Sequence, residues 1–93
     1  MEDLNIGVVG ATGAVGQEFI KILESRYPNA HNIKLLASHR SAGISINVNG
    51  TNIKVEETTE ASFDNIDIAF ISVNTEISKE FAPIAVRAGA VVI

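Results

Sequence analysis

Short runs of apolar residues alternate along this chain with segments of helical periodicity. The apolar runs are rich in Val, Ile and Leu and occupy residues 4–9, 32–38, 66–71 and 91–93. Strands of a buried parallel sheet have this nearly continuous apolar character because helices cover both of their faces. The pattern therefore predicts a central parallel sheet built from these runs.

The segment from Gly13 to about Arg26 has the spacing of an amphipathic helix. The apolar residues that should face the sheet are Val15, Phe19, Ile22 and Leu23. Pro28 should end this helix, since proline lacks the backbone N–H that a continuing helix needs. Gly16 lies in the first turn, where its missing Cβ should let helix and strand approach closely.

A second helical segment runs from Ile77 to Ala88. Ser78 is predicted to be its N-cap and Gly89 to follow its C-terminus, because these residue types favour those positions. Pro83 lies inside the segment and should kink or locally loosen the helix.

Apolar and polar residues alternate from residue 44 to residue 55. The alternation is interrupted by Asn49-Gly50, a dipeptide that readily adopts the positive φ angles of a type I′ turn. We therefore predict an inserted antiparallel hairpin. The segment 56–60, which is rich in glutamate, is expected to form a solvated surface loop, followed by a short helical turn within 61–65.

The alternation of strands and helices predicts an α/β fold. We expect a Rossmann-like, doubly wound parallel sheet with an inserted β-hairpin. With 93 residues, the chain makes one domain at most. It stops inside the last predicted strand, at Ile93, and we interpret this as truncation.

A glycine-rich segment, Gly10 to Gly16, stands between the first strand and the first helix. Glycines permit positive φ and leave room for a ligand, while a helix N-terminus presents unpaired N–H groups. The spacing differs from the usual G-x-G-x-x-G, because Gly10 stands one residue early relative to Gly13 and Gly16. The segment predicts a variant phosphate-binding loop. The alternative is a tight strand-to-helix turn that binds nothing.

Polar segments follow three of the predicted parallel strands, at 10–16, 38–43 and 72–75. The carboxyl ends of parallel strands meet at one edge of the sheet, where ligands of doubly wound folds bind. These segments should therefore share one crevice.

The end of the second strand normally distinguishes NAD from NADP. An acid there receives the ribose 2′-hydroxyl of NAD, whereas an arginine can meet the 2′-phosphate of NADP. This chain has no acid after the strand and has instead Ser38, Arg40 and Ser41. A guanidinium and two hydroxyls suit a dianionic phosphate, so we predict NADP. The alternative is an exposed basic loop.

Composition excludes several classes of function. A net charge of −4 with seven scattered Lys and Arg residues argues against nucleic acid or an anionic membrane as partner. The sequence has no cysteine, and neither His31 nor His39 lies in a carboxylate pattern, so we predict no metal site and expect both on the surface or in loops. The acidic start at 1–3 is unlike a secretory signal, and no apolar run approaches the ~20 residues that span a bilayer, so we expect a cytoplasmic protein.

Three motifs carry a resemblance to a known family: Gly10–Glu18, Leu35–Ser38 with Arg40–Gly43, and Ser78–Pro83. Together they closely resemble the start of aspartate-semialdehyde dehydrogenase, and the similarity runs through essentially all 93 residues. The resemblance implies that residues 1–93 are the N-terminal part of an NADP-binding Rossmann domain. It also implies that the catalytic and dimerisation domain is absent from this chain.

The resemblance assigns residues to the cofactor site. They are Gly10, Thr12, Gly13, Ala14, Val15, Ser38, Arg40, Ser41, Thr58 and Ser72. The first five belong to the phosphate loop, and the next three surround the adenosine 2′-phosphate. The last two lie near the adenine and near the nicotinamide half of the cofactor. Many bacterial members of the family have Ser-Ala-Gly where this chain has Ser72-Val73-Asn74.

The resemblance also implies a reaction for the parent protein. The family uses NADP to reductively dephosphorylate L-aspartyl-4-phosphate, giving L-aspartate 4-semialdehyde for lysine, threonine, methionine and isoleucine biosynthesis. A small-molecule substrate and a homo-oligomeric parent are expected. The family's cysteine nucleophile and its acid–base histidine would lie beyond Ile93, so no residue here is predicted to be catalytic. We expect the chain alone to be inactive, to bind NADP weakly if at all, and to self-associate or be marginally stable.

Two alternatives follow from the same residues. N-acetyl-glutamyl-phosphate reductase is similar in fold and chemistry, but its glycine loop usually carries an aromatic residue where this chain has Ala14 or Val15. A noncatalytic nucleotide-binding module would use the glycine loop without any further domain.

Overall fold

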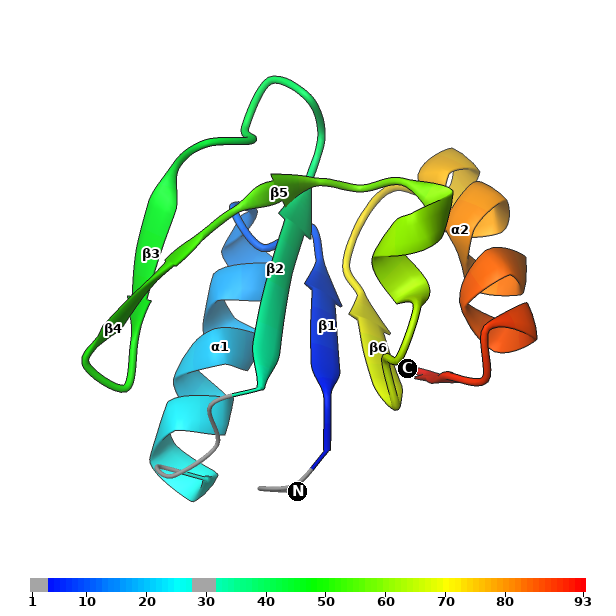
Figure 1. Ribbon diagram of the computed structural model, residues 1–93. Coiled ribbons are helices and arrows are strands. Elements are labelled where there is room, and N and C mark those ends of the chain that lie inside the picture. The colour runs from blue at the N-terminus through cyan, green and yellow to red at the C-terminus, as the bar shows by residue number, and fades with distance from the viewer. Residues whose placement is uncertain (1–3, 28–31) are drawn as a thin grey trace.

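The computed structural model describes residues 4–27 and 32–93 (Figure 1). The elements in chain order are β1 (Ile6–Val9), α1 (Ala14–Arg26), β2 (Ile33–Ala37), β3 (Ser45–Val48), β4 (Thr51–Lys54), β5 (Glu56–Glu57), the 3₁₀ helix η1 (Glu60–Phe63), β6 (Ile68–Ile71), α2 (Thr75–Arg87) and β7 (Val91–Val92). The sequence-based predictions for Pro28, His31 and residues 1–3 lie outside the described residues.

The larger sheet is parallel and has the strand order β5-β2-β1-β6-β7. The chain moves from β1 outward to β2, then returns to the other side of β1 to form β6. Ile6 at the start of β1 therefore pairs with Ile33 on one side and Ile68 on the other. This reversal of direction confirms the Rossmann-like, doubly wound sheet.

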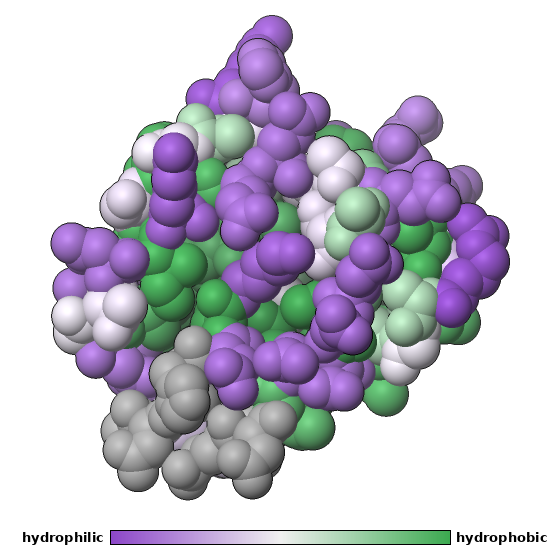
Figure 2. Space-filling model, viewed as in Figure 1, coloured by the Kyte–Doolittle hydropathy of each residue, from purple (hydrophilic) through white to green (hydrophobic). Residues whose placement is uncertain are grey.

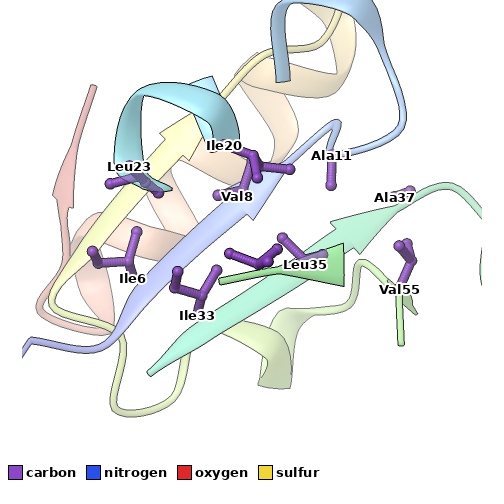
Figure 3. Close-up of a cluster of buried hydrophobic side chains, with 10 residues drawn as sticks. Ile6, Val8, Ala11, Ile20, Leu23, Ile33, Leu35, Ala37 and Val55 are labelled. Carbon is purple, nitrogen blue, oxygen red and sulfur yellow. The ribbon is translucent and has the colours of Figure 1, made fainter. Parts of the chain in front are cut away.

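The two faces of the sheet bury separate apolar cores. Val8 points to a core that includes Ile20 and Leu23 of α1, and Figure 3 shows these helix side chains over the strands. The next residue, Val9, belongs to a second core with Phe63 of η1 and Ala85 of α2. Because successive side chains of a strand point to opposite faces, β1 needs apolar residues at both positions.

The buried face of α1 agrees with the predicted one at Leu23 and at Phe19, which packs partly buried against the core, and differs at the other two predicted residues. Its buried residues are Gly16, Ile20 and Leu23, while Val15 and Ile22 are 61% and 51% exposed. The face of α1 that carries Gly16 packs so closely on the glycine loop that a Cβ on Gly16 would clash with the carbonyl oxygen of Gly10. Only a glycine fits at this contact, so the position of Gly16 decides which face turns inward. The predicted close approach at Gly16 is confirmed.

The predicted hairpin is confirmed as the antiparallel pair β3 and β4. Asn49 and Gly50 at its turn have φ values of 53° and 84°, as a type I′ turn requires. The turn is tied to α1, because the backbone N–H of Asn49 donates to a carboxylate oxygen of Glu24 at 3.0 Å. Val48 of the hairpin is buried in the core on the α1 side of the sheet.

The acidic segment predicted as a loop contains a short strand. Glu56 and Glu57 form β5, which pairs in parallel with Leu36 and Ala37 of β2. This pairing uses backbone groups, and both glutamates are exposed, so their charge does not oppose it. The predicted helical turn follows as η1, whose start is fixed by mutual hydrogen bonds between Thr59 and Ser62.

Helix α2 starts earlier than predicted. Its N-cap is Asn74, whose side-chain oxygen accepts the N–H of Ile77 at 3.0 Å, and Ser78 lies inside the first turns. Asparagine caps as well as serine, so residue type alone did not distinguish the two positions. The helix continues through Pro83. Gly89 follows the end of the helix, as predicted, and has φ 98°.

The surface in Figure 2 is largely hydrophilic around its rim, with hydrophobic residues visible between the polar ones. Among residues 4–27 and 32–93, no helix has the length and apolar character needed to cross a membrane.

Candidate functional site

A cleft of about 460 Å³ opens where the parallel strands end. Its wall combines the loops after β1, β2 and β6 with the first turns of α2. These are the three polar segments that the sequence placed at one edge of the sheet. The crevice between oppositely running connections is where doubly wound folds bind their ligands.

The glycine loop packs tightly between its two neighbouring strands. The backbone N–H groups of Gly10 and Ala11 both donate to the carbonyl oxygen of Leu36 in β2. Gly10 has φ 85°, and a Cβ there would clash with the carbonyl oxygen of Ser72, after β6. Gly10 is thus required both by its dihedral angle and by the space available.

The other two glycines of the loop do not use the positive φ that glycine permits. Gly13 is the N-cap of α1, with φ −78° and ψ 165°, and Gly16 is helical. A Cβ on Gly13 would meet only the carbonyl oxygen of Gly10, at 3.4 Å. Gly13 is exposed and lines the cleft, so its missing side chain leaves space for a ligand rather than for the protein.

The start of α1 presents backbone donors beside this space. No side chain caps the helix, and the N–H groups of Ala14 and Val15 have no acceptor among the described residues. The Gln17 side chain donates to the carbonyl oxygen of Thr12 at 2.8 Å and holds the loop in place. Free N–H groups at the positive end of a helix dipole suit a phosphate.

Ser38, Thr58 and Ser72 all line the cleft, as expected. The Thr58 N–H and hydroxyl both donate to the carbonyl oxygen of Ala37, at 2.9 and 3.1 Å, which fixes Thr58 at the end of β2. The N–H of Ser72 donates to Val9 at 2.9 Å, so Ser72 lies directly beside the glycine loop.

Four of the expected residues lie outside the cleft wall. Ala14 and Val15 belong to the exposed start of α1, and their side chains do not line it. Arg40 and Ser41 lie in the turn after β2, which is closed by hydrogen bonds from Ser41 and Ala42 to the carbonyl oxygen of Ser38. Arg40 is exposed, two residues from the cleft-lining Ser38.

The cleft also contains residues that the sequence did not suggest. Val73, Ile77 and Phe81 give its α2 side an apolar surface that suits a flat ring system. Glu57 lies at the end of β5, and its Oε1 atom is 3.2 Å from Nδ1 of His39. No sequence signal placed Glu57 here, because the short β5 pairing has no periodic pattern.

Within the described parts of the chain, no group of three or more His, Cys, Asp or Glu residues could hold a metal ion. The cleft offers backbone donors, hydroxyl groups and an apolar wall. Such a combination can bind a ligand that carries both phosphate and a planar ring.

Comparison with known proteins agrees with this geometry. The model of the family described as "Semialdehyde dehydrogenase, NAD binding domain" matches residues 5–93. The chain is 43% identical to the aspartate-semialdehyde dehydrogenase of Bacillus subtilis, covering 97% of this chain and 26% of that protein. It is 45% identical to the enzyme of Corynebacterium glutamicum, covering 95% of this chain and 26% of that protein.

Solved structures of similar proteins have the same fold. Aspartate semialdehyde dehydrogenase II from Vibrio cholerae, complexed with ASA, superimposes with a TM-score of 0.89 at 38% identity. The match covers 96% of this chain and 30% of that one. The present chain thus spans between a quarter and a third of these relatives. The match of residues 5–93 to a nicotinamide-dinucleotide-binding domain shows that the chain belongs to the semialdehyde dehydrogenase family.

Proposed function

We propose that this chain is the NADP-binding part of an aspartate-semialdehyde dehydrogenase. The observation that supports it most directly is the cleft in which the Gly10 loop and the uncapped start of α1 face the loops after β2 and β6. The relatives named above support the same family rather than N-acetyl-glutamyl-phosphate reductase.

The cofactor's diphosphate is proposed to lie at the start of α1. The backbone N–H groups of Ala14 and Val15 would donate to it, and the exposed Gly13 would let it approach closely. The adenosine would extend toward Ser38 and Thr58, and the nicotinamide half toward Ser72, since β2 and β6 flank β1 on opposite sides.

NADP rather than NAD is proposed because of Arg40. Its exposed side chain is long and flexible, and it lies two residues from Ser38 at the adenosine end of the cleft. From there the guanidinium can swing over the 2′-phosphate, with the hydroxyls of Ser38 and Ser41 as further donors.

The proposed reaction is the NADP-dependent reductive dephosphorylation of L-aspartyl-4-phosphate to L-aspartate 4-semialdehyde. Because the sequence contains no cysteine, the cysteine nucleophile implied by the family resemblance has no counterpart in these residues. The role of this chain would be to bind and orient the cofactor. Small-molecule substrates, a homo-oligomeric enzyme and a cytoplasmic location belong to the same proposal.

Titration of the ¹⁵N-labelled chain with NADP⁺ and with NAD⁺ tests this function, because NMR shifts detect weak binding. Saturable shifts are expected at residues 10–15, Ser38, Thr58 and Ser72, at lower concentration for NADP⁺. Residues of the hairpin turn, Asn49 and Gly50, lie away from the cleft and serve as internal controls. Shifts that avoid the cleft, or no binding up to millimolar cofactor, would contradict the proposal.

A further inference from the structure

The acidic side chain of Glu57 lies at the adenosine end of the cleft. Its strand, β5, is the neighbour of β2, and the residue that distinguishes NAD from NADP is usually found at the end of β2. Glu57 pairs with Ala37 in the parallel register of β5 and β2, so it stands directly beside the end of β2. Both Glu57 and the neighbouring Ser38 line the cleft. The end of β2 therefore has an acid after all, supplied by a different segment of the chain.

The Glu57 carboxylate is engaged by His39. Nδ1 of His39 lies 3.2 Å from Oε1 of Glu57. An ionised carboxylate only accepts hydrogen bonds, so Nδ1 must be the donor, and an imidazole can donate from this atom whether neutral or protonated. The side chains are 88% and 52% exposed, which leaves both accessible to a ligand in the cleft.

A carboxylate at this place has opposite effects on the two dinucleotides. It can accept a hydrogen bond from the ribose 2′-hydroxyl of NAD, and it repels the 2′-phosphate of NADP. A donor that occupies the carboxylate weakens both effects.

We infer that Glu57 and His39 form a pair that sets the choice between the two dinucleotides, with His39 masking Glu57 so that a 2′-phosphate is tolerated. The inference rests on the proposed dinucleotide function and adds two residues that the proposal does not use. In this arrangement Arg40 attracts the 2′-phosphate, while His39 weakens the repulsion between Glu57 and the 2′-phosphate.

A double-mutant cycle tests the pair. Dissociation constants for 2′,5′-ADP and 5′-AMP are measured by NMR titration for the unmodified chain, His39→Ala, Glu57→Gln and the double variant. These two ligands differ in the 2′-phosphate. His39→Ala is expected to lower the preference for 2′,5′-ADP about two- to fivefold, a modest change because the pair is exposed. Glu57→Gln is expected to raise the preference for 2′,5′-ADP. In the double variant, His39→Ala should change this preference little compared with Glu57→Gln alone.

Lys21→Ala is the matched control. It breaks another exposed pair, between Lys21 and Glu18, whose 4.0 Å contact lies on α1 outside the cleft wall. Its ligand preference should equal that of the unmodified chain. Thermal melting of all variants checks that each is folded, which exposed substitutions should not prevent.

The outcomes separate the two proposals. If both ligands bind at the cleft and His39→Ala leaves the preference unchanged, the inference is wrong and the dinucleotide function stands. If His39→Ala has the same effect with and without Glu57, His39 acts directly on the ligand and the masking role is wrong. If neither ligand binds to the unmodified chain, the proposed function fails and the inference fails with it.

Discussion

Gly16, in the first turn of α1, packs directly against the carbonyl oxygen of Gly10, and a Cβ at residue 16 would overlap that oxygen. The contact fixes the rotation of α1 and the path of the glycine loop together. Since Gly10 in turn packs on the backbone of Ser72, one line of close contacts joins the helix, the loop and the end of β6.

Gly16→Ala is therefore expected to destabilise the fold. Backbone surrounds the added methyl group and cannot give way easily, so the free energy of unfolding should fall by about 2–3 kcal/mol in urea denaturation. Gly13→Ala is the control, because its Cβ would meet only one atom, at 3.4 Å, and it should cost less than about 1 kcal/mol. Equal losses in the two variants would contradict the role of the Gly16 contact.

Gly13→Val should separate binding from folding. Gly13 has φ −78°, which valine can adopt, and it is exposed to the cleft. The branched side chain would fill the space proposed for the diphosphate, so cofactor affinity should fall at least about tenfold, or 1.4 kcal/mol. The melting temperature should change little. Comparable losses of stability and affinity would favour a purely structural turn.

Arg40→Ala should reduce NADP affinity about tenfold while leaving NAD affinity nearly unchanged. A charge-assisted hydrogen bond to phosphate contributes about 1.5–3 kcal/mol, and exposure places Arg40 at the lower end. Arg87→Ala, in the last turn of α2, removes an exposed positive charge outside the cleft and is the control. Isothermal titration with both dinucleotides provides the comparison. An equal loss of affinity for NAD and NADP would show that Arg40 does not bind the 2′-phosphate.

Asn74→Ala should destabilise α2 by about 1 kcal/mol, because it removes the side-chain acceptor at the helix start. Ser78→Ala should have a smaller effect, since Ser78 lies within the helix, where alanine is favourable. Thermal melts of the two variants decide between Asn74, the N-cap in the structure, and Ser78, the N-cap predicted from the sequence. A larger loss for Ser78→Ala would place the helix start at Ser78.

Much of the fold could be predicted because burial leaves a pattern in the sequence. The runs around Val8 and Val9 are apolar at successive positions since both faces of the strand are covered. The hairpin could also be predicted from the sequence, because Asn49-Gly50 provides the φ angles that its turn needs. In each case one local property decided the structure.

The remaining features depend on contacts between distant segments. The rotation of α1 is decided by the approach of Gly16 to Gly10, which outweighs the burial of Val15 and Ile22. Likewise, the place of Glu57 in the cleft comes from backbone pairing with β2, and charged side chains give no sign of it. The sequence therefore predicted the glycine loop of the cleft but did not predict that Glu57 lines the same cleft.

The order in which the strands occur along the chain has a consequence for synthesis on the ribosome. The central strand β1 emerges first, yet one of its two neighbours, β6, follows only after the hairpin and η1. The N–H of Asn5, which donates to the carboxylate of Asp67, can form this hydrogen bond only after 62 more residues have been made. Pairings this far apart slow folding and leave β1 with an open edge in the nascent chain. The cleft has Ser72 against Gly10, so its wall is completed late in this sequence of events, only after β6 has been made.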